Sequence, residues 1–125
     1  MGDYVFPDAA KVVAGALVAA GVPAKGWLQP EDLSGRPVAH VQDMGGTQVS
    51  VFRTDRILVD VYETGRDAAR KLAERVSQIL VDKSHETEHG VIDRVTVEVV
   101  PTFEPYPSDI VAKYNAVYRA ESRPI

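Results

Sequence analysis

The stretch from Arg56 to Leu80 changes its hydrophobic period halfway along, and this change constrains the fold more than any other feature of the sequence. Ile57, Val59 and Val61 alternate with less apolar residues, a pattern that predicts a half-buried strand. From residue 68 onward the apolar residues recur every three or four positions, which predicts an amphipathic helix. Its apolar stripe consists of Ala68, Ala69, Leu72, Ala73, Val76, Ile79 and Leu80. A strand that leads directly into a helix is therefore the predicted centre of the domain.

Polar residues mark the junction between this strand and this helix. Thr64 is expected to cap the first turn, because its hydroxyl can accept a hydrogen bond from a free backbone N–H group. Asp67 places negative charge at the positive end of the helix dipole. It also precedes Lys71 by four positions, which is the favourable order for an ion pair on a helix.

Four further elements flank this unit. They are a helix from Pro7 to about Ala20, a strand from Val38 to Met44 closed by Gly45 and Gly46, a strand from Val91 to Val100 and a strand from Lys113 to Ser122. The order helix, strand, strand, helix, strand, strand predicts an α+β fold in which two main helices flank an antiparallel or mixed sheet. A chain of 125 residues has the usual size of one domain, so residues 1–125 are expected to fold as one unit.

Residues 24–36 are expected to be irregular. Trp27 is expected to form a short strand with Leu28 or to anchor its segment in the core, with an exposed binding hot spot as the alternative. The run 49–52 suggests a short strand, and the polar residues 83–90 suggest a hydrophilic connection. The prolines of 101–107 remove donors that a central strand needs, so this segment is predicted to be a stiff extended loop.

The composition excludes several classes of protein. The net charge of −4 and the pI near 5.3 argue against a broad basic face for nucleic acid, because phosphate neutralisation dominates such binding. The chain has no cysteine, which excludes disulfides and thiolate chemistry. No stretch approaches the ~18 apolar residues of a membrane-spanning helix, and the first residues lack the pattern of a signal peptide. We therefore expect a protein made in the cytoplasm, without a nucleic-acid or membrane partner.

The run His85-Glu86-Thr87-Glu88-His89 matches the H-E-x-x-H pattern, in which two histidines one helical turn apart bind zinc and the glutamate acts as a base. The surrounding sequence argues against this chemistry, because the run is wholly polar, follows the end of the apolar stripe and is ended by Gly90. A third ligand would have to come from His40 or a carboxylate. A solvated turn is therefore predicted, and a minimal zinc hydrolase remains an alternative function.

Asp60 is the other candidate for catalysis, since it lies in the central strand on the less apolar face. A buried catalytic acid is one reading of this position. A side chain that faces solvent or a cross-strand arginine is the expected one. Because no nucleophile turn or phosphate-binding loop accompanies it, the sequence predicts neither an enzyme nor a cofactor.

Several short motifs follow one another in a fixed order. They are Pro7-Asp8, Met44-Gly45-Gly46, Thr54-Asp55-Arg56, Val59-Asp60-Val61, Asp67-Ala68-Ala69, Leu72-Ala73, Val76 and Tyr114-Asn115-Ala116-Val117-Tyr118-Arg119-Ala120. A proline-rich segment, 101–107, precedes the last of them. In this order the motifs resemble the tail terminator, or tail completion, proteins of long-tailed bacteriophages, especially those that infect actinobacteria. The resemblance spans nearly the whole chain.

This resemblance implies a structural virion protein. Such proteins form a ring, typically of six copies, at the head-proximal end of the tail tube, where the ring ends tube polymerisation and offers a surface to the head-completion proteins. The implied partners are other copies of this chain, the tail tube protein and a head-completion or neck protein. The implied location is the phage tail, assembled in the host cytoplasm.

A ring needs two different contact patches on each copy. The nearly uncharged first helix is predicted as one patch, with an exposed alanine-rich face as the alternative. The charged loop 45–56 is predicted as the other patch. The residues assigned to these contacts are Val12, Val13, Ala16, Leu17, Arg53, Asp55 and Arg56, and those assigned to the tube or head are His85, Glu86, His89, Phe103 and Tyr106.

A second class of function is compatible with the same order of elements. A cellular dimer of the ferredoxin-like kind, regulatory or ligand-binding, would need no ring. A defined small-molecule pocket or a clean dimer would favour this alternative.

Overall fold

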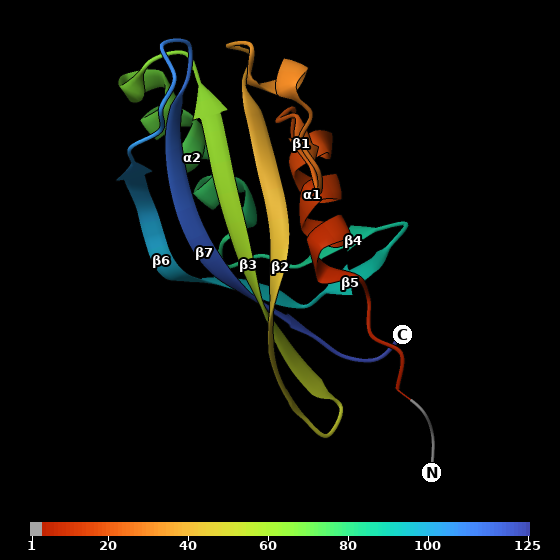
Figure 1. Cartoon of the computed structure of the whole chain (residues 1–125). Coiled ribbons are helices and arrows are strands. Elements are labelled where there is room, and N and C mark those ends of the chain that lie inside the picture. Colours follow the sequence, from red (N-terminus) through yellow and green to blue (C-terminus); the bar gives the residue numbers. More distant parts are fainter. Residues whose placement is uncertain (1–3) are drawn as a thin grey trace.

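Two helices cover one face of a five-stranded sheet in the computed structural model, which describes residues 4–125 (Figure 1). The strands lie in the order β1-β2-β3-β7-β6, and a separate hairpin, β4-β5, lies beside α1. The bounds are α1 Ala9–Ala19, β1 Ala24–Lys25, a 3₁₀ turn Pro30–Leu33, β2 Val38–Val49, β3 Phe52–Glu63, α2 Arg66–Leu80, β4 His85–Thr87, β5 Gly90–Ile92, β6 Arg94–Glu104 and β7 Ala112–Ser122. The predicted α+β class is confirmed, although β1, β4 and β5 are additional to the predicted order.

The sheet is antiparallel except where the short β1 pairs in parallel with β2. β7 lies between β3 and β6, so these two strands are parallel, and α2 with the β4-β5 hairpin connects them as a split β-α-β unit. Moving β7 to the start of the chain would give the β-α-β-β-α-β order of a ferredoxin-like fold. The main elements are therefore a circular permutation of that architecture.

The central strand and helix fold as their hydrophobic period predicts. Ile57, Val59 and Val61 of β3 are at most 1% exposed and belong to the core between the sheet and the helices. The side chains of α2 buried in this core are Ala69, Leu72, Ala73, Val76 and Leu80. The predicted ion pair between Asp67 and Lys71 is present at 3.1 Å.

Thr64 does not cap α2, contrary to the prediction. Gly65 is the N-cap residue, at φ 85°, a left-handed conformation that favours glycine. The Oγ1 atom of Thr64 instead donates a hydrogen bond to the carbonyl oxygen of Gly35 at 2.7 Å. The helix terminus is stabilised by the charge of Asp67 in its first turn.

α1 begins and ends close to the predicted positions. Asp8 caps its first turn by accepting a hydrogen bond from the backbone N–H of Lys11 at 3.2 Å. Gly21 follows the helix in the left-handed conformation, at φ 92°. The apolar stripe of this helix packs into the core of its own domain.

Gly45 and Gly46 do not end a strand, contrary to the prediction. β2 continues through them to Val49 and pairs with β3 on both sides of a bulge between Asp43 and Gly46. A Cβ atom added to Gly46 would overlap the carbonyl oxygen of Thr54, so the two strands approach closely only because this residue is glycine. The predicted loop 45–56 is therefore the distal half of a long hairpin.

Two further predictions are wrong, one about an edge strand and one about an aromatic side chain. β6 continues through Pro101 to Glu104, since it lies at the edge of the sheet and its register shifts between Val99 and Thr102. Trp27 is 76% exposed in the connection after β1 and does not anchor the core.

Candidate functional site

The distal half of the β2-β3 hairpin consists of residues 46–55, and its tip projects beyond the rest of the sheet (Figure 1). We name these residues the hairpin arm. At its base, Arg53, Thr54 and Asp55 still pair with the end of β7. Its tip carries Val49 and Phe52, whose side chains are 74% and 63% exposed. Ser50 and Val51 turn the chain between them, with Ser50 at φ 54°, so the run 49–52 joins two strands and is not the predicted short strand. An apolar tip that its own domain leaves uncovered is typical of a surface that binds another chain.

The arm tip could have been found from the sequence by a different signal. Thr47 and Gln48 before it, and Arg53 and Thr54 after it, are polar at successive positions. Strands that are polar on both faces have no side to bury, so such a pair predicts a hairpin that leaves the sheet.

A buried carboxyl group lies at the base of the arm. Asp55 is 2% exposed, and its Oδ1 atom has no hydrogen-bond partner within residues 4–125. Arg53 approaches this atom at 3.4 Å while its guanidinium also lies 5.1 Å from the ring centre of Phe6. Burial and the nearby carboxylate of Asp43 raise the pKa of Asp55, and Arg53 offsets them only in part. Asp55, predicted as a contact residue, is therefore inside the domain and unavailable to a neighbouring subunit.

The face of the sheet opposite the helices carries paired charges. Arg56 on β3 donates two hydrogen bonds to Glu98 on β6, at 2.8 and 2.6 Å. Arg119 on β7 donates a third at 3.0 Å. These hydrogen bonds, with that of Arg56 as the largest cause, lower the pKa of Glu98. Arg56 thus joins strands on both sides of β7 while its side chain remains about half exposed.

A second charged group on this face surrounds Asp60, which is 5% exposed. Burial raises the pKa of Asp60, and the charge of Lys113, whose Nζ lies 3.9 Å from the carboxylate, opposes this effect. Lys113 also pairs with Glu104, and Gln42 donates a hydrogen bond to Asp60 at 3.4 Å. The predicted solvent-facing position is wrong, because Lys113 and Gln42 lie against the carboxylate. The partner is a lysine and not the expected arginine.

The segment His85-Glu86-Thr87-Glu88-His89 forms a β-hairpin with β5, where a hydrophilic connection with a solvated turn was expected. His85 lies on β4, and His89 lies in the turn before β5. The Nε2 atom of His85 donates a hydrogen bond to the carbonyl oxygen of Leu80 at 2.9 Å, which satisfies a free group at the end of α2. This backbone does not place the two histidines one helical turn apart, as the zinc pattern requires. Within residues 4–125, no three His, Asp or Glu side chains are grouped as a metal site needs.

The predicted subunit contact on the first helix needs correction. Val12, Val13 and Leu17 have no exposed surface, because they fill the core under the sheet. Ala16 is half-buried against the same core. Side chains without accessible surface cannot meet a second subunit, so a contact through α1 would have to use its other residues.

Phe103 and Tyr106, predicted to contact the tube or head, are half-buried. Phe103 lies edge-on to Tyr114, with the guanidinium of Arg66 4.1 Å from its ring centre. Tyr106 lies edge-on to Tyr62. Burial raises the pKa of Tyr62. Both aromatic rings thus have contacts within the domain and retain part of their surface for a partner.

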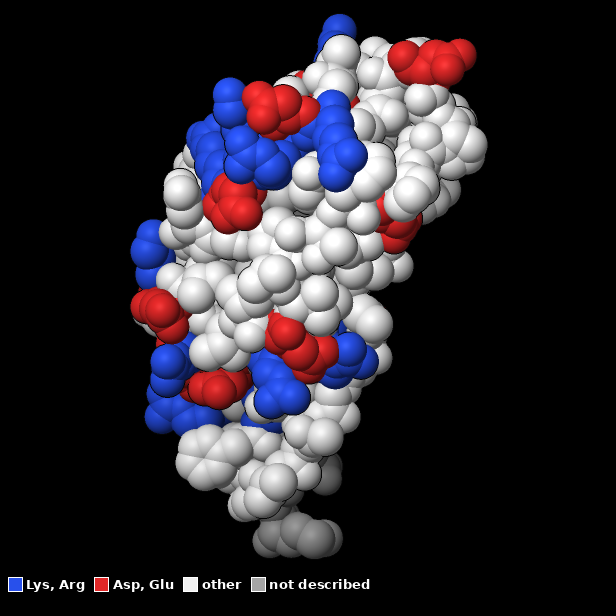
Figure 2. Space-filling view, turned by 90° about the vertical axis from the view of Figure 1, so that its left-hand side faces the viewer, with Lys and Arg blue, Asp and Glu red and all other residues white. Residues whose placement is uncertain are grey.

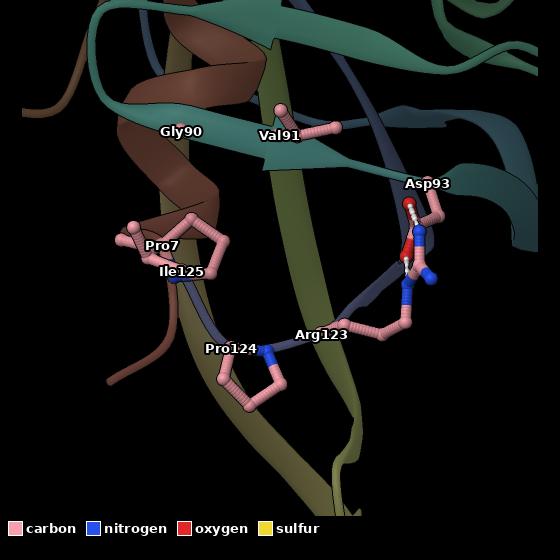
Figure 3. Close-up of a pocket in the computed structure, with 7 residues that line it drawn as sticks. All are labelled: Pro7, Gly90, Val91, Asp93, Arg123, Pro124 and Ile125. Carbon is pink, nitrogen blue, oxygen red and sulfur yellow. Dashed lines mark hydrogen bonds and ion pairs between the residues drawn. The ribbon is translucent and has the colours of Figure 1, made fainter. Parts of the chain in front are cut away.

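A shallow hollow lies between the start of α1, the β4-β5 hairpin and the end of the chain (Figure 3). Its volume is about 420 Å³, and it is lined by Pro7, Gly90, Val91, Asp93, Arg123, Pro124 and Ile125. Arg123 donates two hydrogen bonds to Asp93, at 2.9 and 3.1 Å, so the two charged lining residues neutralise each other. The other lining side chains are apolar, and the hollow therefore fits an apolar side chain of a partner better than a polar small molecule.

Comparisons with known proteins add no family to these observations. No protein-family model matches the chain, and no curated protein is similar enough to count as a relative. Within residues 4–125, no helix has both the length and the apolar character needed to span a bilayer. A function must therefore be inferred from the arm, the charged face and the hollow, together with the resemblance described above.

Proposed function

We propose that this protein is a structural component of a bacteriophage tail. In this proposal, copies of the chain form a ring, typically of six, at the head-proximal end of the tail tube. The ring ends tube polymerisation and presents a surface to the head-completion proteins. The order of sequence motifs suggests this family, and the hairpin arm is the structural observation that supports the role best.

The tip of the arm is informative because it contributes little to the domain that carries it. Beyond the pair of Arg53 with Ser122 on β7, the hairpin has only two strands, and Val49 and Phe52 at its tip expose most of their apolar surface to water. Burial of such side chains is favourable by ~25 cal/mol per Å² of apolar area. A second chain that covers the tip would gain this free energy. An arm with an apolar end therefore suits a protein that works in an assembly.

The charged face supports a protein contact in a different way. Its ion pairs are already formed within the domain, as those of Glu98 with Arg56 and Arg119 show. A preformed polar surface can meet another protein through water and rim contacts without large rearrangement. This property is useful for a ring that must join two different partners.

The proposal is tested by adding the protein to polymerising tail tube protein and measuring tube length by electron microscopy. Wild type is expected to stop elongation and to occur as a hexamer in native mass spectrometry. The variant Val49→Ser/Phe52→Ser should lose this effect while its melting temperature stays within a few degrees of wild type, since both side chains are exposed. Trp27→Ser is the matched control, because it removes an equally exposed aromatic side chain elsewhere. Tubes of unchanged length with wild type would contradict the proposal.

A second candidate function is favoured by one observation, the circularly permuted ferredoxin-like arrangement of the main elements. This architecture is compatible with a dimeric regulatory or ligand-binding module, although a fold alone does not establish a function. A clean dimer in native mass spectrometry, without any effect on tube length, would favour this candidate over the tail ring.

A further inference from the structure

The outward side of α2 carries an excess of positive charge. The exposed charged residues on and beside it are Arg66, Arg70, Lys71 and Arg75, with Asp67 and Glu74 between them. Arg75 lies at the boundary with α1, where its guanidinium donates a hydrogen bond to the carbonyl oxygen of Ala20 at 2.8 Å. Asp67 binds both Arg70 and Lys71, at 3.3 and 3.1 Å, so one acid is shared by two bases. We name these six residues the basic flank. It stands out because the whole chain has a net charge of −4.

A region of opposite sign lies at the start of α1 and on the β4-β5 hairpin. Asp8, Glu86 and Glu88 are exposed there, with Lys11 as the neighbouring base. The hairpin lies against α1, since a side chain added to Gly90 would collide with Pro7 and one added to Gly15 would press on Thr87. We name Asp8, Lys11, Glu86 and Glu88 the acidic flank. Its excess of negative charge equals the excess of positive charge on the basic flank.

The two flanks lie at opposite ends of the helix layer. α2 packs under β3, β6 and β7, α1 packs between α2 and the β4-β5 hairpin, and this hairpin lies beyond α1 (Figure 1). Figure 2 views the side on which α2 and β6 lie, where Lys and Arg gather in two groups with acidic residues among them and uncharged surface between. The layer thus carries an excess of positive charge at one end and an excess of negative charge at the other.

We infer that the basic flank of one copy docks on the acidic flank of the next copy. Two different patches on opposite sides of a subunit make a heterologous, head-to-tail contact, which is the kind of contact that closes a ring. Matched charges set the register of such a contact and exclude like-charged approaches, even where they add little affinity. This inference rests on the proposed ring and identifies the surfaces through which its copies meet.

Apolar surface next to each flank provides the buried area that charge alone does not. The hollow lined by Pro7, Val91 and Ile125 adjoins the acidic flank. On the other side, β6 packs against α2 and exposes Val97 and Val100. An interface with an apolar centre and a charged rim has the composition usual for contacts between proteins.

Charge reversal of each flank tests the inference by native mass spectrometry. Arg70→Glu/Lys71→Glu and Glu86→Lys/Glu88→Lys should each reduce the assembled fraction at least tenfold at a concentration where wild type is a ring. A chain that carries all four substitutions should assemble again with itself, because its flanks are complementary with exchanged signs. It should be excluded from wild-type rings, in which like charges would meet.

Glu31→Lys/Asp109→Lys is the matched control for the acidic flank. Both residues are exposed outside the two flanks, and the pair changes the net charge by the same amount. This control should assemble as wild type does, and melting curves of every variant check that it is folded. Rings that persist in both single-flank variants would overturn the inference and leave the proposed function intact. Loss of assembly on reversal of α2 alone would also overturn it, since it would indicate an acidic partner other than a second copy.

Salt provides an independent measurement on the unmodified protein. Between about 0.01 M and about 1 M ionic strength the Debye length falls from about 30 to about 3 Å, so a charge-guided contact should weaken. The assembled fraction of wild type should fall with salt, and that of the four-fold variant should fall in the same way. A wild type that remains monomeric at every concentration and with tail tubes present would contradict both the inference and the proposed ring. A salt-independent ring would contradict the inference alone.

Discussion

The carboxyl group of Asp55 is buried at the base of the hairpin arm with one oxygen lacking a hydrogen bond within the described residues. Its pKa is raised by burial, so the folded protein holds this proton to a higher pH than the unfolded chain does. The stability that this group provides is therefore complete below its ordinary pKa of 3.8 and is lost as pH rises through the raised value. Above that value the ionised carboxylate destabilises the fold.

Asp55→Asn is expected to raise the free energy of unfolding at pH 7 by ~1 kcal/mol. An uncharged amide avoids the cost of burying a negative charge, and its NH₂ group can donate a hydrogen bond to Asp43. The gain over wild type should shrink as the pH is lowered to 4, because the protonated fraction of Asp55 rises. Urea unfolding at both pH values measures this difference. An equal effect of the substitution at pH 7 and pH 4 would show that Asp55 does not titrate as the structure indicates.

Tyr118 is a second buried residue with a polar atom, but its hydroxyl group is satisfied by a hydrogen bond with Ser77. Burial raises the pKa of Tyr118 to about 12, from an ordinary value of 10.0. The unfolded chain therefore loses this proton first as pH rises. The stability linked to Tyr118 is complete below pH 10 and is lost between pH 10 and about 12.

Tyr118→Phe should lower the free energy of unfolding at pH 7 by ~1 kcal/mol, because it removes one hydrogen bond and leaves Ser77 without its partner. The variant should also lose less stability than wild type between pH 10 and 12. Ser77→Ala is the control, since it removes the same hydrogen bond and keeps the tyrosine that titrates. Parallel alkaline unfolding curves for Tyr118→Phe and wild type would contradict the assignment.

At the scale of elements, the bulge in the β2-β3 hairpin determines where the arm leaves the sheet. The register of the two strands shifts between Asp43 and Gly46, and the chain on the far side of the shift forms the arm. Bulges bend and twist a strand, which gives the arm its direction. Gly46 makes this geometry accessible because its backbone lies against that of Thr54.

Gly46→Ala should destabilise the protein by about 1–3 kcal/mol, because its methyl group would overlap the Thr54 backbone and force the strands apart. Gly26→Ala is the matched control, since a methyl group there would meet its nearest atom at 3.9 Å. Thermal unfolding of both variants measures the contrast. Equal melting temperatures for the two would indicate that the bulge adapts without strain.

The same elements show what the sequence could and could not reveal. The strand and helix of 56–80 were predictable because their burial follows the spacing of apolar residues along the local sequence. Pro101 and the pair Gly45-Gly46 misled the prediction for a different reason. Proline is excluded from a central strand but not from an edge, and glycine can form a bulge as well as end a strand. Neither edge position nor register is a local property of the chain.

At the scale of the whole molecule, the charged face depends on contacts between distant segments. Arg56 meets Glu98 across β7, and Asp60 meets Lys113 of the last strand. Such pairs follow from the strand order β2-β3-β7-β6, which places the C-terminal strand in the middle of the sheet. The sequence predicted the residues of this face as separate polar positions, and only the topology joins them into one network.

One core connects both helices with β2, β3, β5, β6 and β7. A second, smaller cluster surrounds Val38, Tyr62 and Val111. Because the main core includes both helices, a domain of this size is expected to unfold in a single cooperative step, so a defect in either helix should weaken the whole molecule. Leu17, predicted in a subunit contact, is a sensitive probe of this property, because it is fully buried and its neighbour Val18 is 55% exposed.

Leu17→Ala should lower the free energy of unfolding by about 2–5 kcal/mol, because it removes buried surface and leaves a cavity. Leu80→Ala on α2 should have an effect of the same size, and Val18→Ala should change stability by less than about 0.5 kcal/mol. Urea unfolding of dilute protein, followed by circular dichroism, measures the free energy of unfolding of all three variants. If unfolding is cooperative, this free energy should fall with urea concentration at the same slope in each variant. A Leu17→Ala variant that kept its monomer stability and lost only assembly would instead return this residue to a subunit contact, since only an exposed leucine behaves in that way.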